Sequence, residues 1–248
     1  MLGAMIGDIA GSKYEFNNTF DYDFEMFGEE CDFTDDTICT VAIADAILNG
    51  RNYQESLLDW CRRYPSPKGS YGGRFAGWIR SLDPQPYNSF GNGSAMRVSP
   101  VAWLFDDLSQ VLEEAEKSAL PTHNHPEGIK GAKAVAHAIW HFRKSKESHL
   151  PDDEAMKAFK DIARSYYEDF DTQKASSMKP AWMPYHYPSI SSRKPHPSKM
   201  LSASPYLMAA IAIPSEPSLA LSPKPASVFR KRLRTELWNI CRMRCKMY

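Results

Sequence analysis

Apolar side chains recur at helical spacing through most of the first 170 residues. In residues 35–49, for example, Ile38, Val41, Ala42 and Leu48 fall close together on one face of an α-helix. No segment of this part alternates apolar and polar residues in the manner of a β-strand. The predicted fold class is therefore all-α. The pattern predicts helices over residues 2–13, 35–49, 53–63, 98–105, 107–120, 128–144 and 151–170, and a short helix within residues 72–79.

The character of the chain changes after about residue 172. Residues 1–172 carry 17 Lys and Arg against 28 Asp and Glu, a net charge of −11, whereas residues 173–248 carry 13 against 2, a net of +11. The later segment also holds ten of the 18 prolines and has no glycine or aspartate. Such a shift marks a domain boundary or a disordered tail. We therefore divide the chain into a helical body, residues 1–172, and an irregular, basic, Pro- and Ser-rich segment, residues 173–248, with one short helix near residues 228–245.

Composition and charge narrow the expected partners. The formal net charge is zero and the pI is about 7.0, so no global field favours nucleic acid or a membrane surface. No window reaches the apolar length of a transmembrane helix, and residues 1–8 lack the basic start of a signal peptide. The five cysteines form no disulfide framework, so we expect a reducing cytoplasm. Basic residues 230–234 leave nucleic-acid binding as a weak alternative, because few aromatic residues accompany them.

A short acidic stretch, residues 33–37, begins the second predicted helix. Asp35 and Asp36 are adjacent carboxylates flanked by the hydroxyls of Thr34 and Thr37. Such hard oxygen donors suit a Mg²⁺- or Mn²⁺-type ion. The alternative is an ordinary helix start, in which Thr34 is the N-cap and the acidic residues favour the helix dipole. For this stretch alone, the helix start is the better interpretation.

Glu15 follows a glycine-rich helix that contains Gly3, Gly7 and Gly11. Each glycine costs roughly 1 kcal/mol of helix stability relative to alanine, which suggests that another backbone or a ligand approaches closely. A carboxylate just beyond such a helix could act as a general acid or base. For Glu15 as an isolated residue, a solvated surface side chain is the better interpretation.

Two further stretches carry candidate binding residues. Gly91 and Gly93 flank Asn92, which allows left-handed backbone and a nest of N–H groups with Arg97 close behind. If a helix begins near residue 94, this stretch is a plausible phosphate cradle, with an ordinary tight turn as the alternative. His123 and His125 precede the helix of residues 128–144 and could bind a ligand or cap that helix. Within that helix lie two more histidines, at 137 and 141, which we interpret as surface or packing residues, since no zincin glutamate accompanies them.

Taken in order, these stretches resemble the motifs of the ADP-ribosylglycohydrolase family. The matching motifs lie at residues 3–15, 33–37, 91–97 and 122–128. The resemblance covers roughly residues 1–172. It implies an orthogonal helical bundle with a central cleft that holds two divalent ions, Mg²⁺ or Mn²⁺. It also implies hydrolysis of the bond between ADP-ribose and a modified protein side chain or another ADP-ribose, so the expected partner is an ADP-ribosylated protein or ADP-ribose.

The resemblance also assigns roles to individual residues. It implies that Glu15 and Asp36 are catalytic and that Thr34, Asp35 and Asp36 are metal ligands. Metals can orient ribose hydroxyls and lower the pKa of a bound water, and a nearby carboxylate can assist an oxocarbenium-like transition state. Positions around the diphosphate and ribose are implied for Gly91, Asn92, Gly93, Ser94, Met96, Arg97 and His123.

The C-terminal third departs from the family pattern. The family's second metal motif reads Gly-Gly-Asp-Ser-Asp-Thr, but this chain has no glycine after Gly131 and no aspartate after Asp171. Second-site metal ligands are therefore not found. One hypothesis is a frameshift near residue 174, with the frame restored close to Thr235, and the alternative is a natural divergent tail. We expect weak metal binding, low stability and little or no activity; a non-catalytic ADP-ribose-binding or structural protein on the same fold is the alternative function.

Overall fold

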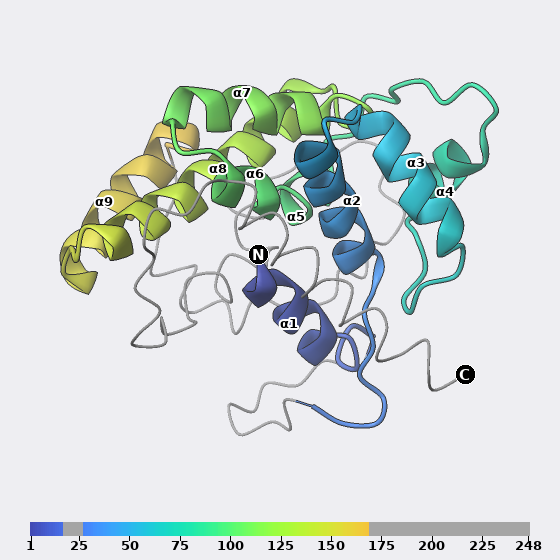
Figure 1. Cartoon of the computed structure of the whole chain (residues 1–248), viewed down its shortest axis with the longest axis horizontal. Helices are drawn as coiled ribbons and strands as arrows, with labels where there is room; N and C mark the ends of the chain where they lie inside the picture. The colour runs from blue at the N-terminus through green and yellow to red at the C-terminus, as the bar shows by residue number, and fades with distance from the viewer. Residues whose placement is uncertain (17–26, 169–248) are drawn as a thin grey trace. The chain divides into compact units, whose positions relative to one another are not determined.

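The computed structural model describes residues 1–16 and 27–168, and within these ranges the regular structure is helical (Figure 1). The one pairing of extended backbone in this part of the chain is an isolated parallel bridge between Thr34 and Lys68. The all-α prediction is therefore confirmed. The helices are α1 (Leu2–Gly11), α2 (Asp35–Asn49), α3 (Tyr53–Arg63), α4 (Gly73–Arg80), α5 (Gly93–Met96), α6 (Ser99–Leu104), α7 (Leu108–Ala119), α8 (Pro126–Glu147) and α9 (Asp152–Tyr166).

The bounds of α2 and α3 agree with the prediction, because both helices have strong terminal signals. The Thr34 hydroxyl accepts a hydrogen bond from the N–H of Asp36, and the Asn52 side chain accepts from that of Gln54. Such N-caps are each worth roughly 0.5–2 kcal/mol. At the other end of α2, Gly50 adopts the left-handed conformation that commonly ends a helix.

Other bounds differ from the prediction for local reasons. Helix α8 begins two residues earlier than predicted because His125 Nδ1 accepts from the N–H of Glu127, with Pro126 in the first helical position. Residues 93–96 form a separate short helix before α6. Helix α9 ends at Tyr166 rather than at residue 170. The tail predicted from residue 173 and the helix predicted near residues 228–245 lie outside the described residues.

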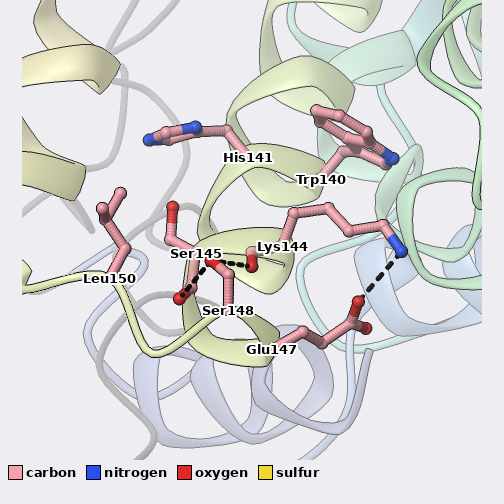
Figure 2. Close-up of a pocket in the computed structure, with 7 residues that line it drawn as sticks. All are labelled: Trp140, His141, Lys144, Ser145, Glu147, Ser148 and Leu150. Carbon is pink, nitrogen blue, oxygen red and sulfur yellow. Dashed lines mark hydrogen bonds and ion pairs between the residues drawn. The ribbon is translucent and has the colours of Figure 1, made fainter.

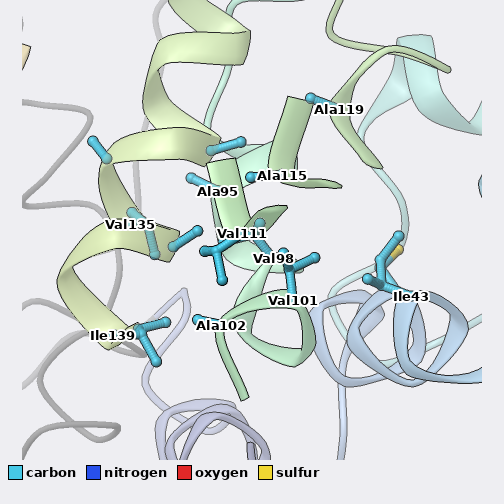
Figure 3. Close-up of a cluster of buried hydrophobic side chains, with 14 of the residues drawn as sticks. Ile43, Ala95, Val98, Val101, Ala102, Val111, Ala115, Ala119, Val135 and Ile139 are labelled. Atoms are coloured by element: carbon cyan, nitrogen blue, oxygen red, sulfur yellow. The ribbon is translucent and has the colours of Figure 1, made fainter. Parts of the chain in front are cut away.

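Helix α8 packs against α5, α6, α7 and α9, and α2 packs against α1, α3 and α6. Figure 1 shows α7, α8 and α9 side by side. Small side chains fill the contacts between these helices, which lets their backbones approach closely. The cluster drawn in Figure 3 includes Ile43, Ala95, Val98, Val101, Ala102, Val111, Ala115, Ala119, Val135 and Ile139. Within the described ranges, no helix is both long enough and apolar enough to cross a membrane.

Leu57 tests how far the α2–α3 contact stabilises the fold. Its side chain is fully buried, so Leu57→Ala should lower the free energy of unfolding by roughly 2–5 kcal/mol in urea denaturation. Leu82 is fully exposed, so the matched control Leu82→Ala should change it by less than about 0.5 kcal/mol. Equal effects of the two substitutions would contradict this packing.

Candidate functional site

The carboxylate of Asp8 joins α1 to the start of α2. Asp8 Oδ2 accepts from the N–H groups of Thr34 (2.8 Å) and Thr37 (3.2 Å) and from the Thr37 hydroxyl (2.5 Å), and Oδ1 accepts from the Thr34 hydroxyl (2.6 Å). Asp8 is buried, and burial raises its pKa, while these hydrogen bonds oppose the rise. Sequence reasoning missed this residue. The signal was present, since Asp8 is the one charged residue within the apolar first helix.

Thr34 is held on both sides by this network. Its hydroxyl donates to Asp8 and accepts from the N–H of Asp36 at 3.2 Å. The helix-start interpretation of this stretch is therefore confirmed. One lone pair of the hydroxyl is still unused, so the helix start does not conflict with metal binding. The role of Thr34 as a metal ligand stays a prediction.

Asp35 and Glu15 lie within one electrostatic cluster with Asp8. Burial, followed by the negative charges of Asp8 and Glu15, raises the pKa of Asp35 to about 7. The pKa of Glu15 is also raised, first by burial and then by Asp8, while Lys68 opposes the shift. Asp36, the neighbour of Asp35, is half-buried in the first turn of α2. The predicted catalytic and metal-binding carboxylates therefore come from segments that meet at this point.

Glu15 is not the solvated side chain that the alternative interpretation required. Its Oε2 atom is buried and has no hydrogen-bond partner in the described part of the chain. Gly69 leaves the space for this carboxylate, because a Cβ atom there would lie 2.3 Å from Glu15 Oε2. Gly69 also has a φ of +79°, which disfavours any larger residue.

The described residues supply only some of the donor atoms that a bound cation needs. Carboxylates that raise one another's pKa, together with an unpartnered buried oxygen, form an environment that a divalent ion would stabilise. Within residues 1–16 and 27–168, however, no group of three His, Cys, Asp or Glu side chains is placed to hold a metal ion. The described residues thus supply at most part of a coordination sphere.

The second candidate region joins residues 88–97 to residues 122–128. Ser89 N donates to Thr122 O (3.2 Å), and the buried Ser94 hydroxyl donates to Gly128 O (2.8 Å). The two stretches can lie this close only because residue 128 is glycine, since a Cβ atom there would lie 2.7 Å from Ser89 O. Two stretches that are about 30 residues apart in the sequence are therefore fixed together at the N-terminal end of α8.

The glycines of this loop serve a purpose other than the predicted left-handed backbone. Among the described glycines, positive φ occurs at Gly50 and Gly69, and not at Gly91 or Gly93. Instead the loop accommodates the ring of His123, since a Cβ on Gly93 would lie 3.0 Å from its Cε1 atom. Two other residues of the loop that are predicted to bind ADP-ribose differ in exposure. Asn92 is exposed at the start of α5, and Met96 packs against the core.

The side chain of Arg97, which the family resemblance places near a diphosphate, is buried, and its role at a ligand stays a prediction. Its guanidinium is 1% exposed and lies in the core, where Nη2 donates to Ser118 O (3.0 Å) and Thr122 Oγ1 (2.8 Å). Packing of α5 against α7 and α8 turns the side chain inward. His123 is also buried, and burial and the positive charges of Arg97 and Arg74 lower its pKa to about 3. The imidazole is therefore neutral at physiological pH.

Comparison with known proteins assigns the family. The sequence model of the family described as ADP-ribosylglycohydrolase matches residues 1–220. The chain belongs to the ADP-ribosylglycohydrolase family. This confirms the resemblance drawn from the four motifs. The match also extends beyond residue 172 into the divergent segment, whose origin by frameshift stays a prediction.

Individual relatives are more distant. The chain is 24% identical to ADP-ribosylhydrolase ARH3 of Xenopus tropicalis over 206 residues, which cover 71% of this chain and 56% of that protein. It is 26% identical to human ADP-ribosylhydrolase ARH3 over 197 residues, covering 61% and 54%. It is also 31% identical to the uncharacterized protein YegU of Escherichia coli K12 over 127 residues, covering 44% and 37%. The chain spans about half the length of the two ARH3 relatives.

A surface pocket on this family member lies apart from the residues above. It has a volume of about 540 Å³ and is formed by the C-terminal part of α8 and the turn after it (Figure 2). It is lined by Trp140, His141, Lys144, Ser145, Glu147, Ser148 and Leu150. His141 Nε2 lies 2.9 Å from Ala155 O, and His137 Nδ1 lies 3.3 Å from the Tyr166 hydroxyl. Each histidine therefore contacts α9, which confirms their interpretation as packing residues.

Substitution of Asp8 tests the junction between α1 and α2. In Asp8→Asn, one carboxamide oxygen replaces two carboxylate oxygens and an NH₂ group faces the buried donors. The free energy of unfolding should fall by roughly 2–4 kcal/mol in urea denaturation. The exposed control Asp83→Asn should cost less than about 0.5 kcal/mol. A change no larger in Asp8→Asn than in the control would refute the proposed junction.

The raised pKa of Asp35 predicts a pH dependence of stability when divalent ions are removed. Between about pH 4 and about pH 7 the unfolded chain releases a proton that folded Asp35 retains, so stability falls as pH rises. In EDTA, Asp35→Asn should therefore raise the Tm relative to wild type increasingly with pH, each 1 kcal/mol giving about 2–4 °C. Thermal melts across this pH range measure the difference. A Tm difference independent of pH would show that Asp35 does not titrate in this way.

Proposed function

We propose that this chain is a hydrolase of glycosidic bonds that removes ADP-ribose from a modified protein side chain or from another ADP-ribose. Membership of the ADP-ribosylglycohydrolase family and similarity to proteins named ADP-ribosylhydrolase support the proposal. The observation that carries it is the buried, unpartnered Glu15 carboxylate oxygen in a cluster with Asp35. A carboxylate kept out of water beside other carboxylates is the group that glycosidic cleavage requires.

Glu15 is assigned the acid or base role. Because burial and the charge of Asp8 raise its pKa, its carboxyl group can hold a proton closer to neutral pH than a solvated glutamate can. Protonation of the leaving group, or removal of a proton from an attacking water, both need this property. The positive charge of Lys68 opposes part of this rise in the pKa of Glu15.

Thr34, Asp35 and Asp36 are assigned to hold a divalent ion, Mg²⁺ or Mn²⁺. When bound, the ion would orient ribose hydroxyls and lower the pKa of a water molecule. It would also neutralise the charges that raise the pKa of Asp35. Glu15 and Asp36 are thus the proposed catalytic carboxylates. Gly91, Asn92, Gly93, Ser94 and His123 are proposed to surround the diphosphate and ribose, with Met96 and Arg97 supporting them from the core.

We further propose that metal binding and activity are reduced in this chain. The family's second metal motif has no counterpart after residue 171, where the sequence has neither aspartate nor glycine. Each ion of the pair expected for the family would lose about half of its protein ligands, so its affinity should fall sharply. A cytoplasmic location is proposed with this function, in keeping with Cys39 and Cys61, which form no disulfide within the described residues.

One observation favours a second function, that of a non-catalytic ADP-ribose binder. Hydrogen bonds from Ser89 and Ser94 join the glycine loop, residues 88–97, to residues 122–128, whereas the carboxylate cluster lacks a complete ligand set among the described residues. A site that keeps the residues that bind ADP-ribose and lacks a complete set of metal ligands would bind ADP-ribose without cleaving its glycosidic bond. Calorimetric titration with ADP-ribose, with and without Mg²⁺, distinguishes this binder from the hydrolase.

The direct test is release of ADP-ribose from an ADP-ribosylated protein, followed by mass spectrometry. We expect slow release that depends on Mg²⁺ and stops in EDTA, because the carboxylates need a cation to act. Glu15→Gln and Asp36→Asn should each reduce the rate by roughly 100-fold or more, the scale of a lost general acid or base. The exposed control Asp83→Asn should keep the wild-type rate.

Three outcomes would argue against the proposal. Release that is equally fast in EDTA would exclude a role for the divalent ion. Wild-type activity in Glu15→Gln would exclude the assigned acid or base. Release at an ordinary rate for this family would contradict the proposed impairment and leave the hydrolase function intact.

A further inference from the structure

His123 presents one edge of its ring to the glycine loop. A Cβ atom built on Gly93 would lie 3.1 Å from His123 Nε2, and one built on Gly91 would lie 3.9 Å from the same atom. Of the two ring nitrogens, Nε2 is therefore the one that faces the proposed binding loop. Whether this atom is a donor or an acceptor depends on which nitrogen carries the proton, and that is fixed by the partner of Nδ1.

The partner of Nδ1 is the hydroxyl of Thr122, at 2.7 Å. The same hydroxyl lies 2.8 Å from Arg97 Nη2. A guanidinium can only donate, so Thr122 Oγ1 is an acceptor toward Arg97 and must place its own proton elsewhere. Within the described ranges, His123 Nδ1 is the one acceptor within hydrogen-bond distance of that hydroxyl. The hydroxyl proton therefore points at Nδ1, and the ring proton resides on Nε2.

Because Thr122 and His123 are buried, the other positions of these two protons are energetically costly. Thr122 is fully buried and His123 is 4% exposed, so an unpaired hydroxyl proton would cost about 1–3 kcal/mol. The opposite tautomer would direct two protons, from Nδ1 and from the threonine, into the same contact. Positive charge from Arg97 and Arg74 also disfavours the doubly protonated imidazolium. The neutral ring with a proton on Nε2 is the state in which the buried Thr122 hydroxyl and His123 Nδ1 satisfy each other.

The buried position of Arg97 supports a role beyond stability. Its Nε atom has no hydrogen-bond partner, and no carboxylate is among the groups within residues 1–16 and 27–168 whose charge acts on it. Burying a guanidinium without a counter-ion is costly, and an apolar residue would be expected in a site that only needed packing. The contacts that Arg97 does make end on Ser118 and Thr122, the residue that sets the proton of His123.

We propose that Arg97 and Thr122 are positioning residues that hold His123 as the neutral tautomer with its proton on Nε2, so that Nε2–H donates to an oxygen of ADP-ribose at the Gly91–Gly93 loop. The part that concerns ADP-ribose rests on the proposed function. The part that concerns the tautomer rests on the contacts of Arg97, Thr122 and His123 alone. A neutral donor serves here because a charged imidazole would be opposed by both arginines.

The test begins with ¹⁵N NMR of the imidazole in the ligand-free wild-type protein. We expect the chemical shifts of a neutral ring protonated at Nε2. Thr122→Val keeps the shape of the side chain but removes the hydroxyl, so a mixture of tautomers should appear. Thr122→Ser restores the hydroxyl and should restore the wild-type spectrum. Thr40→Val, at another buried threonine on α2, is the matched control and should leave the spectrum of His123 unchanged.

Calorimetric titration with ADP-ribose then measures the consequence for binding. Thr122→Val should raise the Kd for ADP-ribose by about tenfold, the scale of one lost hydrogen bond. The Kd values of Thr122→Ser and Thr40→Val should stay within about twofold of the wild-type value. An Nδ1-protonated or charged His123 in the wild-type protein would overturn the proposal. This measurement does not depend on whether any variant folds. The expected tautomer in a wild-type protein that does not bind ADP-ribose would support the positioning of His123 and overturn the proposed function.

Discussion

Four hydrogen bonds to one buried carboxylate determine how the acidic start of α2 is placed. The Asp8 carboxylate accepts all four from the N–H and hydroxyl groups of Thr34 and Thr37, and these bonds hold α1 against the start of α2. These donors oppose the rise in the pKa of Asp8 that burial causes. Asp35 and Glu15 lie in the same electrostatic cluster, where burial and then the charges of neighbouring carboxylates raise their pKa values. A cation bound beside these carboxylates would stabilise their charged form.

The second element of the site depends on small residues and buried polar contacts instead of charge. Gly93 and Gly128 allow the loop at residues 88–97 and the ring of His123 to approach within van der Waals contact. The Ser94 hydroxyl then bonds the loop to the first turn of α8. Because α8 is also the helix against which α5, α6, α7 and α9 pack, the loop is tied to the most constrained part of the described fold.

Local signals made part of this structure predictable, and packing determined the rest. Helices with a clear N-cap, at Thr34 and Asn52, have the bounds that the sequence predicts. Asp8 was missed because its partners lie 26 to 29 residues away, and no local pattern shows that they meet. The direction of Arg97 depends on how α5 packs against α7 and α8, so residue type and spacing suggested a ligand contact where the structure has a buried support.

The central claim is that Asp35 and Asp36, next to Glu15, form part of a divalent-cation site. Crystals soaked in millimolar Mn²⁺ and measured near the manganese absorption edge test it most directly, because anomalous scattering locates the ion without reference to activity. The account predicts an anomalous peak within about 2.5 Å of a carboxylate oxygen of Asp35 or Asp36. Ordered, unliganded carboxylates at Asp35 and Asp36 under the same conditions, with no peak beside them, would contradict it.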